Sequence, residues 1–553
     1  MRFDRDEMVA RLTTEEFDLL VIGGGITGVG VALDAASRGL RTALVERYDF
    51  ASGTSSKSSK LIHGGLRYLQ QGDVRLVYQA LRERQRLLNN ARHLVSVLPF
   101  LIPVLSKDGP VSKKIAKALR SALWMYDVTG GIRIGRRHRR LNAVEALAHC
   151  PTMPADRLSS AFVYYDAGAD DARLTLAIAR TAAVHGAAIA NRCRVEKITK
   201  DSAGRVNGAL VDTGGATITI RARSVVSAAG VWADDVRALD DASAPGLMRP
   251  AKGVHITVPW RLVGNDIAVI ISVPKDKRSL FLIPWGQQPD GTFDHCYVGT
   301  TDTDFVGDLE SPQTNDDDLD YVIDALNRTL TATISRADVT GTWAGLRPLV
   351  KAAPSSRTAD LSRRHQISET TSGLITVVGG KLTTYREMAE DTVDVVLDHL
   401  GRRGRCKTRR MKFVGSLGYQ RVPDDDPDVR LSRRYGTELG EIKSLIELDP
   451  SLADPLVPGL RYIKAEAIQA VRREMATELT DVLCRRTRAH LEDRSACLSA
   501  APDVARLIAR ELGWTDDHIA DQVASYAAMC AAEVAAAHEP DARQDTRAES
   551  THP

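Results

Sequence analysis

Residues 18–46, "DLLVIGGGITGVGVALDAASRGLRTALVE", decide the fold of this chain. The apolar run at residues 19–22 predicts a strand that enters a glycine-rich turn, and a helical pattern of apolar residues follows until Gly39. A second apolar run, at residues 42–45, ends at Glu46. Strand, glycine turn, helix and strand within about 30 residues are typical of the βαβ unit that binds a dinucleotide.

The glycines of this turn have the spacing Gly23-x-Gly25-x-x-Gly28. The first glycine permits the tight turn, the second lets the backbone approach a pyrophosphate, and the third lets the helix pack closely on the strand. The pyrophosphate would then lie at the positive N-terminus of the helix. Glu46 would accept hydrogen bonds from both ribose hydroxyls of an adenosine, which argues against the 2′-phosphate of NADP. The spacing does not decide between FAD and NAD.

Two later segments favour FAD. Residues 225–230, "VVSAAG", predict a strand that stops at small residues, where a dinucleotide can pass closely. Residues 379–386, "GGKLTTYR", are expected to open a helix. The N-terminal amides of that helix would face the pyrimidine ring of a flavin, which is anionic when reduced.

The chain resembles the FAD-dependent glycerol-3-phosphate dehydrogenases, the aerobic bacterial enzymes and their mitochondrial counterparts. The resemblance covers residues 18–390, and the helical region beyond fits the cap domain of that family more loosely. Its motifs are "VIGGGITGVGVALDAASRGL", "TSSKSSKLIHGGLRYL", "DDARL", "KGVH", "GTTDTDF", "WAGLRPL" and "VVGGKLTTYREMAE". It implies an α/β protein with a glutathione-reductase-like, FAD-binding Rossmann domain, a mixed-sheet substrate domain and a C-terminal α-helical domain.

We expect an FAD-dependent oxidoreductase region over residues 1–400, in which two kinds of segment alternate. The FAD-binding segments are about 17–70, 190–235 and 365–400, and the substrate-binding segments are about 71–189 and 236–364. A basic linker at 401–430, a helical domain at 431–538 and a polar tail at 539–553 follow.

The resemblance also identifies cofactor-binding residues. Residues 53–69, "GTSSKSSKLIHGGLRYL", have the composition of a solvated serine and lysine loop, but in the family this segment wraps the flavin. The FAD is expected to be noncovalent, because no motif marks a covalent linkage. The expected contacts are Gly23, Gly24, Gly25, Thr27, Gly28, Glu46, Arg47, Thr54, Ser55, Ser58, Ser59, Lys60, His63, Gly64, Val195, Ala229, Gly230, Gly380, Lys381, Leu382 and Thr383.

The implied substrate is sn-glycerol 3-phosphate, whose phosphate carries about −1.5 to −2 charge at neutral pH. Several cations should meet it, with arginine preferred for its planar fork. The residues that match the family are Arg67, Tyr68, Arg347, Arg363 and Lys381. For Arg363 the alternative is a surface pair with Arg364.

The implied reaction transfers hydride from C2 to the flavin and the C2 hydroxyl proton to a base, for which histidine is the usual choice. His63 and His255 lie in family motifs, and the sequence does not decide between them; Arg347 can polarise the C2 oxygen. The electrons would pass to a membrane quinone. An oxidase that releases hydrogen peroxide, and a flavin-binding sensor without turnover, are the alternatives.

The net charge of +3 gives no indication of a nucleic-acid partner. The seven cysteines include no CxxC pair, so we expect neither a metal site nor a disulfide framework. No apolar run of about 18 residues indicates a membrane span. We expect a cytoplasmic protein at the inner face of the cell membrane; the oligomeric state is open, a homodimer included.

Residues 111–140 are the candidate for membrane contact. The helical pattern at 111–126 places basic residues on one side and apolar residues on the other, which is typical of binding to anionic lipid or of packing on a protein core. The basic residues are Lys113, Lys114, Lys117 and Arg120, and Arg133, Arg136, Arg137, Arg139 and Arg140 follow. The apolar residues expected to enter the lipid are Ile115, Leu119, Leu123 and Tyr126.

Overall fold

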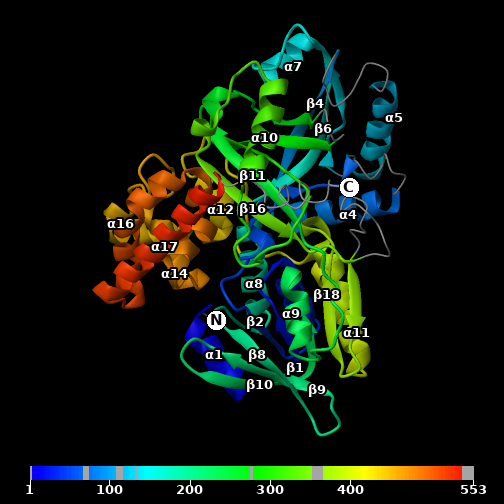
Figure 1. Ribbon diagram of the computed structural model, residues 1–553, viewed down its shortest axis with the longest axis vertical. Coiled ribbons are helices and arrows are strands. Elements are labelled where there is room, and N and C mark those ends of the chain that lie inside the picture. The colour runs from blue at the N-terminus through cyan, green and yellow to red at the C-terminus, as the bar shows by residue number, and fades with distance from the viewer. Residues whose placement is uncertain are drawn as a thin grey trace, which may run out of the picture.

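The computed structural model describes residues 3–66, 74–106, 116–131, 134–273, 278–351 and 365–538 of the chain. Figure 1 shows two sheet-containing lobes along the long axis, with the C-terminal helices beside them. The predicted fold class, an α/β FAD-binding domain with a mixed-sheet domain and a helical domain, is confirmed.

The first sheet has the strand order β17-β18-β10-β1-β2-β7. Its strands are β1 (Glu16–Ile22), β2 (Thr42–Val45), β7 (Ala188–Ala190), β8 (Arg194–Lys200), β9 (Val206–Asp212), β10 (Thr217–Ser227), β17 (Gln366–Glu369) and β18 (Leu374–Val378). The five strands from β18 to β7 are parallel, and β17 is antiparallel at the edge. Such sheets are buried on both faces, which explains the continuous apolar runs in β1 and β2.

Helices cover this sheet. They are α1 (Arg5–Thr14), α2 (Ile26–Ser37), α8 (Asp171–Val184), α9 (Ala233–Ala238) and α11 (Tyr385–His399). The helix α2 packs against both α8 and α11, while α1 packs on β7 and β10. The unit β1-α2-β2 is the βαβ motif predicted from residues 18–46, and it forms the centre of the largest apolar core.

The second sheet is mixed, with the order β15-β11-β14-β13-β12-β4-β6-β3, and β16 and β5 pair with β11 and β6. Its strands are β3 (Leu61–Ile62), β4 (Val95–Leu105), β5 (Arg139–Leu141), β6 (Leu158–Ala169), β11 (Ala251–Pro259), β12 (Ala268–Val273), β13 (Arg278–Gln287), β14 (Phe293–Gly299), β15 (Thr303–Asp304) and β16 (Gly341–Arg347). Within the described part of this second sheet, only the β12–β4 pair is parallel. The helices α4 (Val74–Asn90), α5 (Ala116–Tyr126), α7 (Ala143–His149) and α10 (Asp316–Thr329) pack around it.

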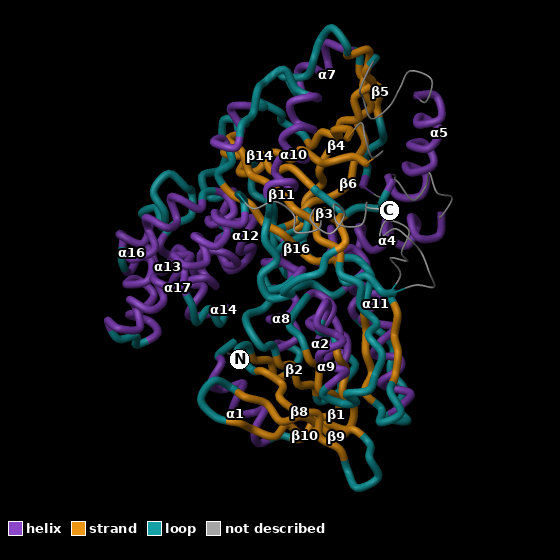
Figure 2. The backbone as a smooth tube through the Cα atoms, viewed as in Figure 1, coloured by secondary structure: helices purple, strands orange, loops and turns teal. Residues whose placement is uncertain are grey.

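The C-terminal part consists of helices joined by loops (Figure 2). They are α12 (Val429–Tyr435), α13 (Leu439–Leu448), α14 (Lys464–Glu474), α15 (Ala489–Glu492), α16 (Arg494–Leu512) and α17 (Asp516–Ala536). They enclose an apolar core of their own. Buried ion pairs attach this domain to the first lobe: Arg173 of α8 meets Glu474 at 2.7 Å, and Arg486 meets Asp49 at 2.6 Å.

The predicted amphipathic helix is present as α5, but its apolar face does not face outward. Leu119, Leu123 and Tyr126 are buried in a core shared with α4 and the second sheet, and the Tyr126 hydroxyl donates to Asp166 at 2.7 Å. The expectation that these three side chains enter lipid is therefore wrong, because the same stripe packs on protein. Lys113, Lys114, Ile115, Arg133 and the side chain of Lys117 lie outside the described residues. Within the described part of the chain, no helix is long and apolar enough to cross a bilayer.

Candidate active site

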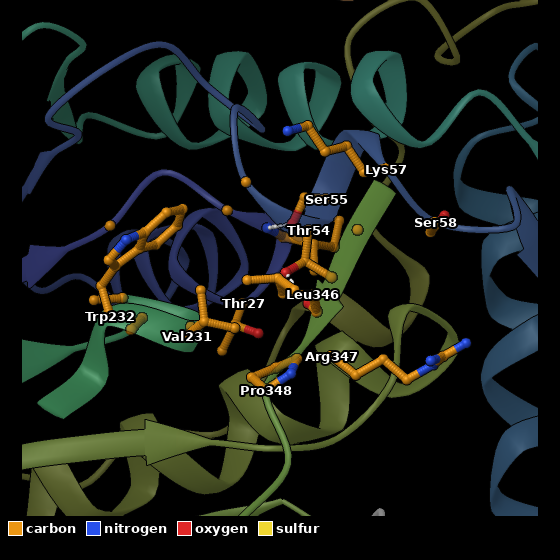
Figure 3. A pocket seen from close by; sticks show the side chains of 18 of the residues that line it. Thr27, Thr54, Ser55, Lys57, Ser58, Val231, Trp232, Leu346, Arg347 and Pro348 are labelled. Carbon is orange, nitrogen blue, oxygen red and sulfur yellow. Dashed lines mark hydrogen bonds between the residues drawn. The ribbon is translucent and has the colours of Figure 1, made fainter. Parts of the chain in front are cut away.

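A cavity of about 630 Å³ is lined by both sheets and the loops between them. Its walls come from the ends of β1 and β2, the start of α2 and four segments that are distant in sequence, at residues 52–59, 228–232, 345–349 and 379–383. Figure 3 shows Trp232 on one side and, nearer the middle of the view, Thr54 close to Leu346. The glycine turn of the βαβ unit thus opens onto this cavity.

Most of the predicted site residues line this cavity. They are Gly23, Gly25, Thr27, Glu46, Arg47, Thr54, Ser55, Ser58, Ser59, His63, Val195, Ala229, Gly230, His255, Arg347, Gly380, Lys381, Leu382 and Thr383. Gly24, Gly28, Lys60 and Gly64 are not among the lining residues. Arg67, Tyr68 and Arg363 lie outside the described residues.

The backbone geometry of the turn requires glycine at two positions. Gly23 has φ +113°, a conformation that favours glycine, and a Cβ on Gly28 would lie 1.9 Å from the Gly23 carbonyl oxygen. Gly25 is the N-cap of α2 and offers no side-chain cap, so no side chain of the cap residue covers the first amides of the helix, which starts at the cavity wall. One of them, Ile26 N, donates to the Ser55 hydroxyl at 2.9 Å. This arrangement suits an anion such as a pyrophosphate.

Glu46 lies at the end of β2 with its carboxylate buried. Its two oxygens accept hydrogen bonds from Gly24 N at 2.6 Å and Tyr48 N at 2.8 Å. Burial raises the pKa of this carboxyl, and the two backbone donors oppose the shift. Each carboxylate oxygen has a further lone pair, so the group can still accept ribose hydroxyls.

Trp232 is a wall residue that the sequence analysis did not identify. The Arg47 guanidinium lies 4.6 Å from the centroid of its ring, and Arg47 also pairs with Glu310. A Cβ on Gly53 would lie 2.9 Å from the indole, so the loop approaches the ring closely. Trp232 follows the small residues that end β10, and no motif separates it from an ordinary core tryptophan.

The loop at residues 53–60, which we call the cofactor loop, is held by hydrogen bonds to several elements. The Thr54 hydroxyl donates to Leu346 O at 2.6 Å. Ser58 donates to Asp171 Oδ2 through its hydroxyl at 2.6 Å and through its amide at 3.1 Å. Ser59 Oγ lies 2.8 Å from His255 Nε2. The serines therefore fix the loop as well as line the cavity.

The two candidate bases lie in different settings. His255, on β11, stacks on Trp343 of β16 with ring centroids 4.8 Å apart. Burial, with smaller contributions from Lys60 and Arg347, holds the pKa of His255 well below its usual value, so the imidazole is neutral at pH 7. His63 lies beside the start of α11, where its amide donates to Thr383 Oγ1 at 3.2 Å.

Arg347 ends β16 and extends away from Trp232 (Figure 3). It donates to Asp302 Oδ1 at 2.9 Å, to Thr301 O at 2.9 Å and to Thr300 Oγ1 at 3.2 Å. Asp302 is thus a positioning residue for this guanidinium. It was not identified from the sequence, although it lies in the motif "GTTDTDF".

Lys60 and Gly64 support the wall and do not line it. The Lys60 ammonium is buried 3.2 Å from Asp171 Oδ1 and 4.8 Å from the centroid of the Trp343 ring. Burial, reinforced by Arg488, lowers the pKa of Lys60 to about 8. Gly64 N donates to the Tyr126 hydroxyl oxygen at 3.0 Å, on the side of α5.

Comparison with known proteins agrees with this geometry. Residues 18–386 match the family described as FAD dependent oxidoreductase, and residues 406–519 match the C-terminal domain of alpha-glycerophosphate oxidase. The chain is 38% identical over 550 residues to glycerol-3-phosphate dehydrogenase 2 of Mycobacterium tuberculosis, covering 96% of this chain and 91% of that protein. The chain belongs to the FAD-dependent glycerol-3-phosphate dehydrogenase family.

Other members of this dehydrogenase family agree over most of the chain. A probable mitochondrial glycerol-3-phosphate dehydrogenase of Caenorhabditis elegans is 39% identical over 531 residues, which cover 91% of this chain and 71% of that protein. The crystal structure of the glycerol-3-phosphate dehydrogenase from Bacillus halodurans, complexed with FAD, superposes with a TM-score of 0.76 at 30% identity, covering 97% and 98% of the two chains.

FAD is the cofactor of this enzyme family, as the resemblance implied, and the cavity fits it. The fit rests on the glycine turn, the uncapped start of α2, the buried acceptor Glu46 and the second helix start at Leu382–Thr384. A Cβ on Gly230 would meet no atom within 4 Å, which shows open space at that wall.

Proposed function

We propose that this protein oxidises sn-glycerol 3-phosphate to dihydroxyacetone phosphate with noncovalent FAD, and that a membrane quinone receives the electrons. One observation carries the proposal: His255 and Arg347, a neutral base and a fixed cation, line the same cavity as the cofactor cradle. The relatives named glycerol-3-phosphate dehydrogenase support the choice of substrate.

When bound, FAD supplies the oxidant that accepts hydride from C2 of the substrate. His255 accepts the proton of the C2 hydroxyl, and Ser59 orients its imidazole from Nε2. His63 is the alternative base. Arg347 and Lys381 bring positive charge to the cavity for the phosphate or for the oxygen at C2. Arg67, Tyr68 and Arg363 stay predicted substrate contacts.

The test is anaerobic mixing of the purified holoenzyme with glycerol 3-phosphate, followed by flavin absorbance. We expect rapid bleaching of the flavin, and an equal concentration of unphosphorylated glycerol should act far more slowly. A flavin that stays oxidised would overturn the proposal and favour the sensor without turnover. Acid precipitation should release all flavin into the supernatant; flavin retained on the washed pellet would contradict noncovalent binding.

Oxygen is the second candidate acceptor. The match of residues 406–519 to a domain named after an alpha-glycerophosphate oxidase favours it specifically. Turnover with a short-chain quinone under anaerobic conditions, compared with peroxide release in air, separates the two. Quinone turnover with little peroxide supports the dehydrogenase, and peroxide equal to substrate consumed supports the oxidase.

A membrane quinone requires contact with lipid, and the surface of α5 supplies a candidate. Trp124, Met125 and Val128 are 64%, 40% and 51% exposed and form what we call the Trp124 patch. Exposed basic residues nearby in the chain are Arg120 on α5, Arg136 and Arg137 before β5, and Arg139 and Arg140 on β5. Exposed aromatic and apolar side chains next to arginines are typical of a protein surface that lies on anionic lipid. We propose that this surface contacts the inner face of the cell membrane.

A further inference from the structure

One short segment of the C-terminal domain, residues 485–491, reaches the wall of the cofactor cavity. We call it the arginine segment. Its central residue, Arg488, is fully buried. The guanidinium bridges two parts of the chain: Nη1 donates to Cys484 O of its own domain at 3.0 Å, and Nη2 donates to Ser56 O of the cofactor loop and, at 2.8 Å, to Asp171 Oδ1. A side chain from the last quarter of the chain thus holds a loop near its start.

Asp171 carries this contact further into the loop. While Oδ1 accepts from Arg488 and from Lys60 Nζ at 3.2 Å, Oδ2 accepts both the amide and the hydroxyl of Ser58. Asp171 is fully buried, so its carboxylate depends on these cations and donors for its position. Removing Arg488 would leave Lys60 as the remaining ion-pair partner that the described structure gives Asp171.

The residue after Ser58 is the one that meets the candidate base. Ser59 Oγ lies 2.8 Å from His255 Nε2, and Ser59 O accepts a hydrogen bond from the Tyr297 hydroxyl at 3.1 Å. Four consecutive links, from Arg488 to Asp171, to Ser58, to Ser59 and to His255, therefore connect the C-terminal domain with the candidate base.

The arginine segment also touches the strands that carry His255 and Arg347. Leu491 O accepts the Thr257 hydroxyl of β11 at 2.7 Å, two residues after His255. A Cβ on Gly341, the first residue of β16, would lie 2.2 Å from Leu491 O. The C-terminal domain is thus in direct contact with both strands of the site.

Arg488 also has an unusual backbone. Its φ is +89°, in the left-handed region that residues with a side chain rarely adopt. Such a conformation persists only where the surroundings fix it. It directs the guanidinium out of the helical domain and into the cofactor loop.

We propose that Arg488 is a positioning residue of the active site, which sets the conformation of the cofactor loop and thereby FAD affinity and the Ser59–His255 contact. The effect on FAD affinity stands on the cavity alone. The effect on His255 rests on the proposed function.

A matched control at the same interface distinguishes a positioning role of Arg488 from a merely structural one. Glu474 accepts two hydrogen bonds from Arg173, at 2.7 and 3.2 Å, and so joins α14 to α8. This ion pair is as buried as that of Arg488, and neither partner lines the cavity. Glu474→Gln should therefore lower Tm without disturbing the cofactor loop.

The experiment compares the parent, Arg488→Gln, Arg488→Lys and Glu474→Gln. For each we would titrate apoprotein with FAD, record the visible circular dichroism of the bound flavin, and measure flavin reduction at saturating FAD and glycerol 3-phosphate. For Arg488→Gln we expect the Kd for FAD to rise at least tenfold, the circular dichroism to change and the reduction rate to fall at least tenfold. Arg488→Lys keeps the charge but cannot reach both acceptors, so its values should be intermediate.

Glu474→Gln should keep the Kd for FAD and the reduction rate within about twofold of the parent. The proposal is overturned if a folded Arg488→Gln protein does the same, or if Glu474→Gln shows equal losses. If Arg488→Gln does not fold, Arg488→Lys decides by the same criteria. A parent that is not bleached by glycerol 3-phosphate would overturn the proposed function, while the FAD affinity and the dichroism would still test Arg488.

Discussion

Ser59 Oγ and His255 Nε2 are 2.8 Å apart and join the cofactor loop to strand β11. The contact occupies one nitrogen of a buried, neutral imidazole and fixes the plane of its ring, which also stacks on Trp343. The loop that lines the FAD cavity therefore also orients the candidate base. One hydrogen bond thus links the segment that lines the FAD cavity with the side chain proposed to accept the substrate proton.

This relationship makes His255 the first target. Replacing a general base usually costs 10²–10⁴-fold in rate. We expect His255→Gln to slow flavin reduction by glycerol 3-phosphate at least about a hundredfold at saturating substrate, and His63→Gln to slow it less. Anaerobic stopped-flow absorbance measures both. The reverse order of effects would assign the base to His63.

Glu46→Gln should weaken FAD binding. Charge-assisted hydrogen bonds contribute roughly 1.5–3 kcal/mol, so affinity should fall about tenfold or more. The structure adds a second cost, because an amide nitrogen in this place would face the donors Gly24 N or Tyr48 N. Titration of apoprotein with FAD gives the answer, and an unchanged Kd would remove Glu46 from the cofactor site.

Arg347→Lys separates two roles of one cation. An ammonium cannot reach Asp302 and the Thr301 carbonyl in the way that the planar fork does. We expect a large loss of kcat/KM for glycerol 3-phosphate and a much smaller loss for unphosphorylated glycerol. Equal proportional losses for both would mean that Arg347 serves the reacting carbon and not the phosphate.

The Trp124 patch can be tested with vesicles. Each apolar side chain fully removed from water contributes roughly 1.5–3 kcal/mol, so Trp124→Ser combined with Met125→Ser should weaken binding to anionic vesicles at least tenfold. Leu448→Ser, an exposed apolar position in the C-terminal domain, is the matched control and should bind as the parent does. Flavin reduction by glycerol 3-phosphate should be unchanged in both proteins.

The electrostatic part of this contact needs its own variant. A variant with Gln at four positions tests it: Lys113, Lys114, Lys117 and Arg120. Vesicle binding of the parent at increasing salt concentration is the companion measurement. Co-sedimentation should fall in the variant and, for the parent, with added salt. If neither this variant nor the Trp124 and Met125 variant loses vesicle binding, another surface faces the lipid.

His93 gives the protein a predictable sensitivity to acid. Burial, reinforced by Arg173 and Arg180, lowers the pKa of His93 from 6.5 to about 3. The unfolded chain takes up this proton below pH 6.5 and the folded chain does not, so the free energy of unfolding falls as pH drops toward 3. The slope is up to about 1.4 kcal/mol per pH unit.

His93→Gln removes this contribution. The free energy of unfolding of His93→Gln, relative to that of the parent, should therefore rise as the pH falls from 7 to 4, whatever its value at pH 7. Urea unfolding at both pH values measures the difference. A difference that does not change with pH would show that His93 does not titrate in this way.

The parts of the structure that could be predicted depend on local constraints. The turn around Gly23 and Gly28 has few backbone solutions, so residues 18–46 indicated both fold and cofactor. The orientation of α5 could not be predicted, because a stripe such as Leu119 and Leu123 is the same whether lipid or protein covers it. The helix content of the C-terminal region was predictable from composition.

The contacts of the arginine segment could not be predicted either. Arg488 and Ser56 are distant in the chain, and no local pattern in "DVLCRRTRAH" distinguishes arginines that reach another domain from arginines on a solvated helix. Asp302 could have been identified from the sequence, because it lies in the motif "GTTDTDF". Its pairing with Arg347, however, follows from sheet geometry that neither segment specifies alone.

The order of strands in the first sheet has a consequence for synthesis on the ribosome. Strand β10, at residues 217–227, lies between β1 and β18, and β18 is formed by residues 374–378. The cofactor loop also accepts a hydrogen bond from Arg488, which is synthesised later still. Domains usually fold in order as they emerge, but here the first βαβ unit shares its sheet with β10 and β18, which are synthesised much later. We therefore expect the FAD cavity to be completed late, because segments that line it, such as residues 379–383, emerge after most of the chain.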